Sequence, residues 1–374
     1  MDFESIQGEF PIKKNLIYFN NASIGPMSNR VISRITSFLN DVRDYGRLHY
    51  PNWCQYADAE IKGDIAEFIG ADSSEIAFVK NTTEGILIVS NGLDWRPDDN
   101  VIIADIEYPS NVYCWMNLER KGVSIKWVKN KSGRILVEDI EELVDPRTRL
   151  VSLSAVQFSN GFRLDIERLS DLCRKRKILL NLDAIQWLGA LHMDLKKYHI
   201  DFLSAGGHKW LLGPIGTGIF YCNKNSMEYI YPHNVGYHSV EKSEDHMDYE
   251  LIFRPNAGRF EEALVNFPGI WGLHEAIRTF LELGTENVEK HIFDLISHAI
   301  EGLKAKAYEI TSPLGKKEGS GILSFRHPTT PSVKIYDNLA KNNINVAIRA
   351  GNLRMSPSIY NDHDEVERFL KILN

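Results

Sequence analysis

The chain has few cysteines, and none of them lies close to another. Cys54, Cys114, Cys173 and Cys222 are separated by about fifty to sixty residues, and no C-x-x-C pair occurs. A zinc knuckle and a dense disulfide framework both need closely spaced cysteines, so neither is expected. Thiols spread in this way are typical of the reducing cytosol, and we predict a cytoplasmic location. No metal site is predicted.

Long apolar runs and basic blocks are also missing. The longest apolar stretches are far shorter than the roughly 18 residues of a membrane-spanning helix. The N-terminal MDFESIQGEF is acidic and lacks the apolar stretch of a signal peptide. The formal net charge is −7, which gives no support to nucleic-acid binding. We therefore predict an acidic soluble protein without nucleic-acid or membrane partners.

The length of the chain and the order of its segments predict two domains. With 374 residues, 43% of them hydrophobic, the chain exceeds the size at which one core usually splits. Short β-branched runs alternate with amphipathic segments, which indicates an α/β fold with a mainly parallel sheet between helices. From about Gly269 the pattern is that of a smaller α+β domain. We predict a large domain over 15–262 and a small C-terminal domain over 263–374, with 1–14 packing near the latter.

The stretch from Ile178 to Tyr221 carries the most specific chemical signal. Asp183 ends an apolar, strand-like run, and Lys209 follows His208 and a Gly-Gly pair. A buried carboxylate needs a cationic partner, and a desolvated lysine has a lowered pKa and can form an imine. Pyridoxal phosphate (PLP) requires both groups, one for its protonated ring nitrogen and one for the Schiff base. The alternatives are a helix-capping aspartate and a solvated surface lysine.

Further candidates follow other predicted strands, because ligands of a doubly wound sheet gather at the carboxyl ends of its strands. The segment 80–86 (KNTTEGI) lies between a strand and a helix. Thr82 and Thr83 are therefore predicted to bind the phosphate, although simple N-capping uses the same geometry. Tyr108 follows another strand and either stacks on the pyridine ring or packs in the core.

Three more polar residues belong to the expected cofactor site. Gln157 follows a fourth strand, and it competes with Asn160 as the side chain that faces the cofactor. Gln186 is placed to hydrogen-bond the ring hydroxyl. His208, next to the lysine, is either catalytic or a structural histidine.

Two arginines near the C-terminus suggest how a substrate would be held. Arg349 and Arg354 lie in strand-like surroundings, and a guanidinium binds a carboxylate by a two-pronged contact. For either arginine alone, an exposed strand position is the alternative. The segment Gly213-x-x-Gly-x-Gly looks like a phosphate loop, but it does not open a helix after a strand, so a turn is the better interpretation.

These residues together resemble the class V aminotransferase family of fold-type I PLP enzymes, which includes cysteine desulfurases, kynureninase and isopenicillin N epimerase. The similarity covers nearly the whole chain, and its most specific part is DAIQWLGALHMDL followed by DFLSAGGHKWLLGPIGTG. The resemblance implies a fold-type I PLP enzyme that forms a homodimer with its active sites at the subunit interface.

The resemblance also implies roles for single residues. Lys209 would be the Schiff-base lysine, Asp183 the partner of the pyridinium nitrogen and His208 a contact at the phosphate site. Separately from the resemblance, His208 is carried as a catalytic candidate beside Lys209 and Asp183. The predicted cofactor-binding residues are Lys209, Asp183, Gln186, Thr82, Thr83, Tyr108, His208 and Gln157, and the predicted substrate-binding residues are Arg354 and Asn21.

Two departures from the family pattern bear on the reaction. Cysteine desulfurases carry a persulfide-forming cysteine on the loop before the carboxylate-binding arginine. Here that loop is only Ala350–Leu353 and contains no cysteine, so a desulfurase is disfavoured. Relatives often have a Gly-Thr segment that reaches the partner subunit's phosphate, where this chain has Ala263-Leu-Val-Asn-Phe.

We therefore expect a PLP-dependent aminotransferase that acts on a small α-amino acid, with Lys209 moving the proton between substrate and cofactor. A β-elimination lyase that cleaves C–S or C–N bonds and an amino-acid epimerase use the same residues and are alternatives. A non-catalytic binding protein on the same fold is a third alternative, and the presence of Lys209 and Asp183 speaks against it.

Overall fold

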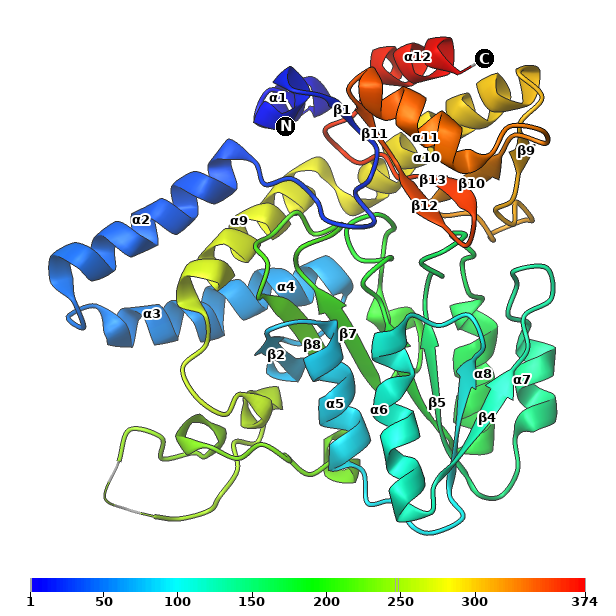
Figure 1. The fold of residues 1–374 in the computed structure, drawn as a ribbon. Helices are drawn as coiled ribbons and strands as arrows, with labels where there is room; N and C mark the ends of the chain where they lie inside the picture. Colours follow the sequence, from blue (N-terminus) through cyan, green and yellow to red (C-terminus); the bar gives the residue numbers. More distant parts are fainter. Residues whose placement is uncertain (1, 246, 248, 374) are drawn as a thin grey trace.

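The computed structural model describes residues 2–245, 247 and 249–373, and a seven-stranded sheet lies at its centre (Figure 1). Its strands follow the order β2-β8-β7-β6-β5-β3-β4. Neighbouring strands from β7 to β4 are parallel, and β8 runs antiparallel to both of its neighbours. The strands are β2 (Ile76–Val79), β3 (Asn100–Ala104), β4 (Ser124–Val128), β5 (Thr148–Ser154), β6 (Leu179–Asp183), β7 (Phe202–Gly206) and β8 (Gly218–Cys222).

Helices cover both faces of this sheet. Successive strand residues point to opposite faces, and they enter two separate hydrophobic cores: Ile102 lies in one core and Ile103 in the other. Side chains of α4, α7 and α8 fill the first core, and side chains of α5 and α6 fill the second. Strands that are apolar on both sides need this double cover. The helices are α4 (Lys62–Ile69), α5 (Thr82–Gly92), α6 (Tyr113–Met116), α7 (Val137–Leu143) and α8 (Ile166–Arg176).

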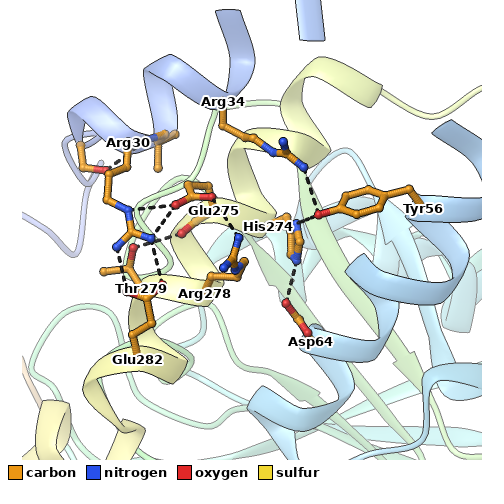
Figure 2. A network of polar contacts seen from close by, with 11 residues as sticks. Arg30, Arg34, Tyr56, Asp64, His274, Glu275, Arg278, Thr279 and Glu282 are labelled. Atoms are coloured by element: carbon orange, nitrogen blue, oxygen red, sulfur yellow. Dashed lines mark hydrogen bonds and ion pairs between the residues drawn. The ribbon is translucent and has the colours of Figure 1, made fainter. Parts of the chain in front are cut away.

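Three further helices, α2 (Asn29–Tyr45), α3 (Tyr50–Tyr56) and α9 (Phe267–Leu283), flank the sheet at its β2 side (Figure 1). Polar contacts join α2 to α9, as Figure 2 shows. The Arg30 guanidinium lies 2.7 Å from a Glu275 carboxylate oxygen and 2.9 Å from one of Glu282. An early and a late segment of the chain are thereby held together.

A second chain of contacts in Figure 2 runs from α2 through α3 and α9 to α4. The Arg34 guanidinium donates to the Tyr56 hydroxyl (3.0 Å), which lies 3.4 Å from Nδ1 of His274. Nε2 of His274 lies 2.7 Å from an Asp64 oxygen. His274 is buried, and this burial lowers its pKa although Asp64 opposes the shift.

The C-terminal part contains a smaller antiparallel sheet in the order β12-β13-β10-β9. Helices pack on this sheet, and a turn of two residues joins β12 to β13. The elements are α10 (Thr285–Ala305), β9 (Glu309–Ile310), β10 (Leu323–Arg326), α11 (Ser332–Lys341), β11 (Ile344–Asn345), β12 (Ala347–Arg349), β13 (Asn352–Met355) and α12 (His363–Ile372).

The N-terminal segment contacts this C-terminal part. Strand β1 (Ile17–Tyr18) pairs with β11 in parallel, and the Phe3 ring of α1 (Phe3–Gln7) stacks on His291. The Lys13 ammonium lies 2.8 Å from Asp362 and 2.9 Å from Glu365. These contacts support our proposal that 1–14 packs near a small domain beginning at 263.

Short helical turns complete the described elements, and they are Pro11–Lys14, Ala57–Ile61, Ser73–Glu75, Pro109–Asn111, Asn117–Lys121, Leu195–Lys197, Met227–Tyr229, Tyr237–Ser239 and Ala257–Phe260.

The predicted fold class is confirmed, since a mainly parallel sheet between helices adjoins a smaller α+β part. Among the residues that the structure describes, no helix combines the length and the apolar character needed to cross a membrane.

Candidate active site

The predicted cofactor-binding residues follow the carboxyl ends of five strands of the large sheet. These ends belong to β2, β3, β5, β6 and β7, which all run in one direction because β8 reverses twice between β2 and β7. Parallel strands of this kind place their carboxyl ends at one edge of the sheet. The residues that the sequence singled out separately are thereby brought to the same edge.

Lys209 lies in the tight turn that follows β7. A side chain at Gly207 would approach Thr217 Oγ1 to 2.6 Å and Leu273 to 3.0 Å, so glycine is required there for the close packing of this turn. Burial lowers the pKa of Lys209 to about 8, against the opposing effect of Asp183. Arg354 and Arg349 lower it further. A substantial neutral fraction near neutral pH makes this amine a nucleophile and a base.

Asp183 ends β6, and its side chain is 2% exposed. Its Oδ1 accepts a hydrogen bond from the Ile185 backbone N–H (3.0 Å). Burial raises its pKa to about 7, Glu107 adds to the rise, and Lys209 opposes it. Such a carboxyl is ready to accept a cation, and the protonated nitrogen of a pyridine ring is a suitable one.

Tyr108 follows β3 and is 44% exposed. The side-chain nitrogen of Lys209 lies 5.4 Å from the centroid of its ring, and the Phe158 ring packs against the same tyrosine in an edge-on arrangement, at 5.2 Å between centroids. The structure therefore places Tyr108 over the reactive amine. This position fits the predicted stacking on the cofactor ring.

Thr82 and Thr83 open α5, which Asn81 caps by accepting from the Glu84 N–H (2.9 Å). The Thr82 hydroxyl oxygen accepts from the Gly206 N–H (2.8 Å), so it also ties α5 to the lysine turn. Thr83 donates to the Ser110 hydroxyl (2.8 Å). The helix N-terminus with its two hydroxyls fits a phosphate.

His208 is half-buried and directly precedes Lys209. Burial and the neighbouring lysine both lower its pKa. The imidazole is therefore neutral near pH 7, in the state in which it can donate one hydrogen bond. This leaves His208 as a proposed phosphate or catalytic contact.

The three amide candidates differ in the hydrogen bonds that they already make. Asn160 donates to Gly133 O (2.8 Å) and accepts from the Phe162 N–H (3.0 Å). Gln186 donates to Ala22 O (3.0 Å) and accepts from the Trp210 indole (2.7 Å). Gln157 is 1% exposed, and its Oε1 is a buried acceptor without a partner in the described part of the chain. Of the three, Gln157 is the side chain with an unused acceptor for a ligand.

Arg354 on β13 is 1% exposed. It donates to Phe158 O (2.7 Å) and to the Ser23 hydroxyl (2.8 Å), and its Nε is buried without a partner among the described residues. Burial lowers its pKa to about 10, with a further contribution from Arg349. The contacts of Arg354 are neutral oxygens, so its charge is available for an anionic ligand.

Asn21 acts on the lysine turn through the main chain. It is fully buried, donates to the Lys209 carbonyl (3.4 Å) and accepts from the Tyr360 hydroxyl (3.2 Å). Both ends of its amide are therefore used by the protein. The predicted substrate contact of Asn21 stays a prediction.

Sequence reasoning gave too little weight to Arg349, Ser23 and Glu107. Arg349 lies 3.5 Å from the same Ser23 hydroxyl that Arg354 contacts, because the two-residue turn at 350–351 folds the two arginines onto one side. Glu107 is buried and accepts from Gln157 (2.8 Å). The order Glu107-Tyr108 after a strand was the available signal for Glu107.

The four cysteines lie away from the turn that precedes Arg354. Ala350 and Gly351 form this turn with φ angles of 46° and 79°, the positive values that a two-residue hairpin requires. Cys114, Cys173 and Cys222 are buried, Cys54 is half-buried on α3, and all four are free thiols.

The residues present fit PLP. The site combines a buried carboxyl with a raised pKa, a half-buried amine with a lowered pKa, an orphaned amide acceptor, an aromatic ring and a helix N-terminus. Asp183 would hold the ring nitrogen, Lys209 the aldehyde carbon and the start of α5 the phosphate.

Comparison with known proteins agrees with this cofactor. The family described as Aminotransferase class-V matches residues 17–369. A probable cysteine desulfurase of Pyrococcus abyssi is 27% identical, over 99% of this chain and 96% of its own length. A probable cysteine desulfurase of Methanothermobacter thermautotrophicus is 28% identical, over 78% of this chain and 73% of its own.

Solved structures give the same picture. A cysteine desulfurase from Thermococcus onnurineus superposes with a TM-score of 0.89 at 25% identity, covering 99% of this chain and 96% of that one. The cystine C-S lyase C-DES, in complex with its reaction product cysteine persulfide, superposes with a TM-score of 0.89 at 23% identity, covering 97% and 98%. Another C-DES structure holds a ligand covalently linked to PLP.

The expectation of an aminotransferase, with cysteine desulfurase disfavoured, is therefore wrong. The similar proteins are named as cysteine desulfurases or probable cysteine desulfurases, and two of them match over 99% of this chain and 96% of their own length. The error came from treating a cysteine in 350–353 as a requirement for cleaving a C–S bond. In C-DES the persulfide is carried by the product cysteine, so a missing thiol in one turn does not exclude this chemistry.

Proposed function

Because the chain belongs to the class V aminotransferase family and uses PLP, we propose that it is a carbon–sulfur lyase acting on cysteine or cystine. The observation that carries the proposal is the shared site of a half-buried amine with a lowered pKa, Lys209, and a buried guanidinium with an unpartnered nitrogen, Arg354. The names of its relatives support the sulfur-containing substrate.

In the proposed reaction, Arg354 binds the α-carboxylate of the amino acid, and the neighbouring Arg349 adds positive charge. Bound PLP supplies an electron sink for negative charge at Cα. Asp183 keeps the proton on the ring nitrogen that makes this sink effective. Lys209, whose pKa is about 8, removes the proton from Cα. The C–S bond at Cβ then breaks, with sulfur as the leaving group.

The test is an assay of all products from one substrate. The purified, PLP-loaded protein is incubated with L-cysteine or L-cystine, and sulfide or persulfide, pyruvate, ammonia and alanine are measured together. Sulfur release with pyruvate and ammonia indicates elimination, and transfer of sulfur to an added thiol, which becomes a persulfide, with formation of alanine indicates desulfuration. Both support C–S cleavage. Absence of released sulfur from both substrates, with an active control enzyme, contradicts the proposal. Lys209→Ala should abolish the products.

We also propose that the protein is a cytoplasmic homodimer. Helix α2 and the chain that follows it expose a stripe of apolar side chains, and large exposed apolar patches mark association surfaces. The stripe consists of Ile32, Leu39, Val42, Tyr45 and Leu48. The four free thiols support a reducing compartment. Light scattering should give twice the chain mass, and Leu39→Glu with Val42→Glu should shift it toward the single chain.

A further inference from the structure

Glu107, directly before Tyr108, is a buried carboxyl that accepts four hydrogen bonds. Its Oε1 accepts from the Ser154 N–H (2.9 Å) and from Gln157 Nε2 (2.8 Å). Its Oε2 accepts from the Ser154 hydroxyl and from Asn111 Nδ2 (3.1 Å). Burial raises the pKa of Glu107, and these hydrogen bonds oppose the rise. A carboxyl that accepts hydrogen bonds from four donors is in an environment that favours its ionised form.

The orientation of each amide in this cluster follows from groups that can only donate. The Trp115 indole N–H donates to Asn111 Oδ1 (2.9 Å), as does the Ser152 hydroxyl. An indole N–H can only donate a hydrogen bond. Asn111 Oδ1 must therefore face Trp115, which leaves Asn111 Nδ2 facing Glu107. The backbone N–H of Ser154 is likewise a fixed donor. Both therefore require acceptor oxygens at Glu107.

The same logic fixes Gln157. Its side-chain amide contacts Glu107 Oε1, which already accepts from the Ser154 N–H. The Nε2 end of the amide must therefore point toward Glu107. Its Oε1 is then left as the buried acceptor without a partner in the described part of the chain. Ser154, three residues before Gln157, pairs with Asp183 across β5 and β6, so this free acceptor belongs to the cofactor edge of the sheet.

We propose that Glu107 is a positioning residue that holds the acceptor end of the Gln157 amide toward the ring hydroxyl of PLP. The inference rests on the cofactor contact proposed for Gln157 and not on the lyase reaction. An acceptor at this place favours the neutral hydroxyl, whereas a donor would favour the ionised one. Glu107 thereby tunes the cofactor without touching it.

Two variants of Glu107 separate this role from a simple charge effect. Glu107→Gln removes the charge but keeps one oxygen, which the Ser154 N–H and Gln157 Nε2 can share. Its new Nε2 can donate to the Ser154 hydroxyl, and only Asn111 Nδ2 loses its acceptor. Glu107→Met has a similar shape but no acceptor, so the Gln157 amide is free to turn its donor end outward. The measurement is the ratio of the two absorption bands of bound PLP, which report the neutral and the ionised ring hydroxyl, taken without substrate across pH.

Glu107→Met should shift this ratio roughly fivefold toward the ionised form, the size of one net hydrogen bond, and Glu107→Gln should leave it near the wild-type value. Equal shifts in both variants would show that Glu107 acts through its charge on Asp183, and the proposal would be overturned. Unchanged ratios in both would overturn it as well.

Gln157→Leu provides the test if Glu107→Met does not fold. It removes the acceptor directly and should shift the band ratio in the same direction. An unchanged ratio in Gln157→Leu contradicts the proposal, because Glu107 would then have nothing to position. Since no substrate is present, these outcomes are independent of whether the protein cleaves C–S bonds.

Discussion

The side-chain nitrogen of Lys209 lies 5.4 Å from the centroid of the Tyr108 ring. Lys209 follows β7 and Tyr108 follows β3, and β6 and β5 lie between these strands. The contact therefore spans the ends of the two strands that lead to Asp183 and Gln157. Residues from four strands face one site, and single substitutions in it should have distinct effects on cofactor, substrate and stability.

Asp183→Asn should stabilise the protein without its cofactor at pH 8 and weaken PLP binding. Burial raises the pKa of Asp183 to about 7, so above this pH the folded protein holds an unfavourable buried charge that the unfolded chain carries freely. Stability from this group is thus highest at low pH and falls as the pH rises toward 7. Urea unfolding of the cofactor-free protein should show a gain of about 1–3 kcal/mol.

The control for this prediction is Asp165→Asn, which changes the exposed N-cap of α8. It should leave PLP affinity unchanged. If Asp183→Asn instead bound PLP as tightly as the wild type, Asp183 would not be the partner of the ring nitrogen.

The rate at which PLP attaches covalently to the cofactor-free protein should rise with pH and level off above about 8. Only the neutral amine of Lys209 reacts, and its pKa is lowered to about 8. An ordinary lysine, with a pKa near 10.4, would still gain roughly tenfold in rate per pH unit up to pH 10. Stopped-flow absorbance measures this rate directly.

Arg354→Met should move the midpoint of that pH profile upward, since Arg354 contributes to the lowered pKa of Lys209. Lys131→Met, at an exposed position, serves as the control with an unchanged midpoint. A midpoint that stayed in place in Arg354→Met would show that Arg354 does not contribute to the lowered pKa of Lys209.

Arg354→Lys should weaken binding of cysteine by roughly 1.5–3 kcal/mol, the range for a hydrogen bond to a charged group. Lysine keeps the charge but loses the two-pronged geometry. Binding of cysteamine, which has the same amine and thiol but no carboxylate, should barely change. Spectral titration of the PLP-loaded protein measures both affinities.

Arg326→Lys, on the exposed end of β10, is the matched control and should have no effect. Arg349→Lys should give a smaller loss than Arg354→Lys, because Arg349 lies at the longer distance from Ser23. Equal losses for cysteine and cysteamine would mean that Arg354 supports the fold and not the carboxylate.

The free energy of unfolding should decrease as the pH falls below about 6.5, in part because of His274 (Figure 2). Burial lowers the pKa of the His274 imidazole in the folded protein. As the pH falls, the unfolded chain therefore binds a proton at His274 at a higher pH than the folded protein does, and this stabilises the unfolded state. His274→Gln should flatten the decrease. Asp64→Asn should steepen it, because Asp64 raises the pKa of His274. Urea titrations at several pH values measure both slopes, and parallel curves for all three proteins would contradict this role.

The sequence was sufficient for the parts of the site whose surroundings are local. Lys209 is recognisable from the glycines before it, and Asp183 from the apolar strand that it ends. The α/β fold follows from the alternation of strands and helices. These signals lie within a few residues of each other, so no tertiary information is needed to interpret them.

The remaining features depend on contacts between distant segments. Gln186 looked free in the sequence, yet Ala22 and Trp210 occupy both ends of its amide. Glu107, which follows β3, accepts from Ser154 of β5 only because these two strands are neighbours. The reaction type was misjudged because it depends on where sulfur goes after bond cleavage, which the presence or absence of one cysteine does not decide.

The pairing of β1 with β11 has a consequence for synthesis on the ribosome. Chains grow from the N-terminus and their domains generally fold as units, but Phe19 and Asn21 hydrogen-bond to Ser356, and Ser23 contacts Arg354. These particular contacts cannot form until almost the whole chain has emerged. The central sheet, which ends at Cys222, can form well before that. A nascent chain can thus acquire its reactive lysine before it acquires the arginine that selects a substrate.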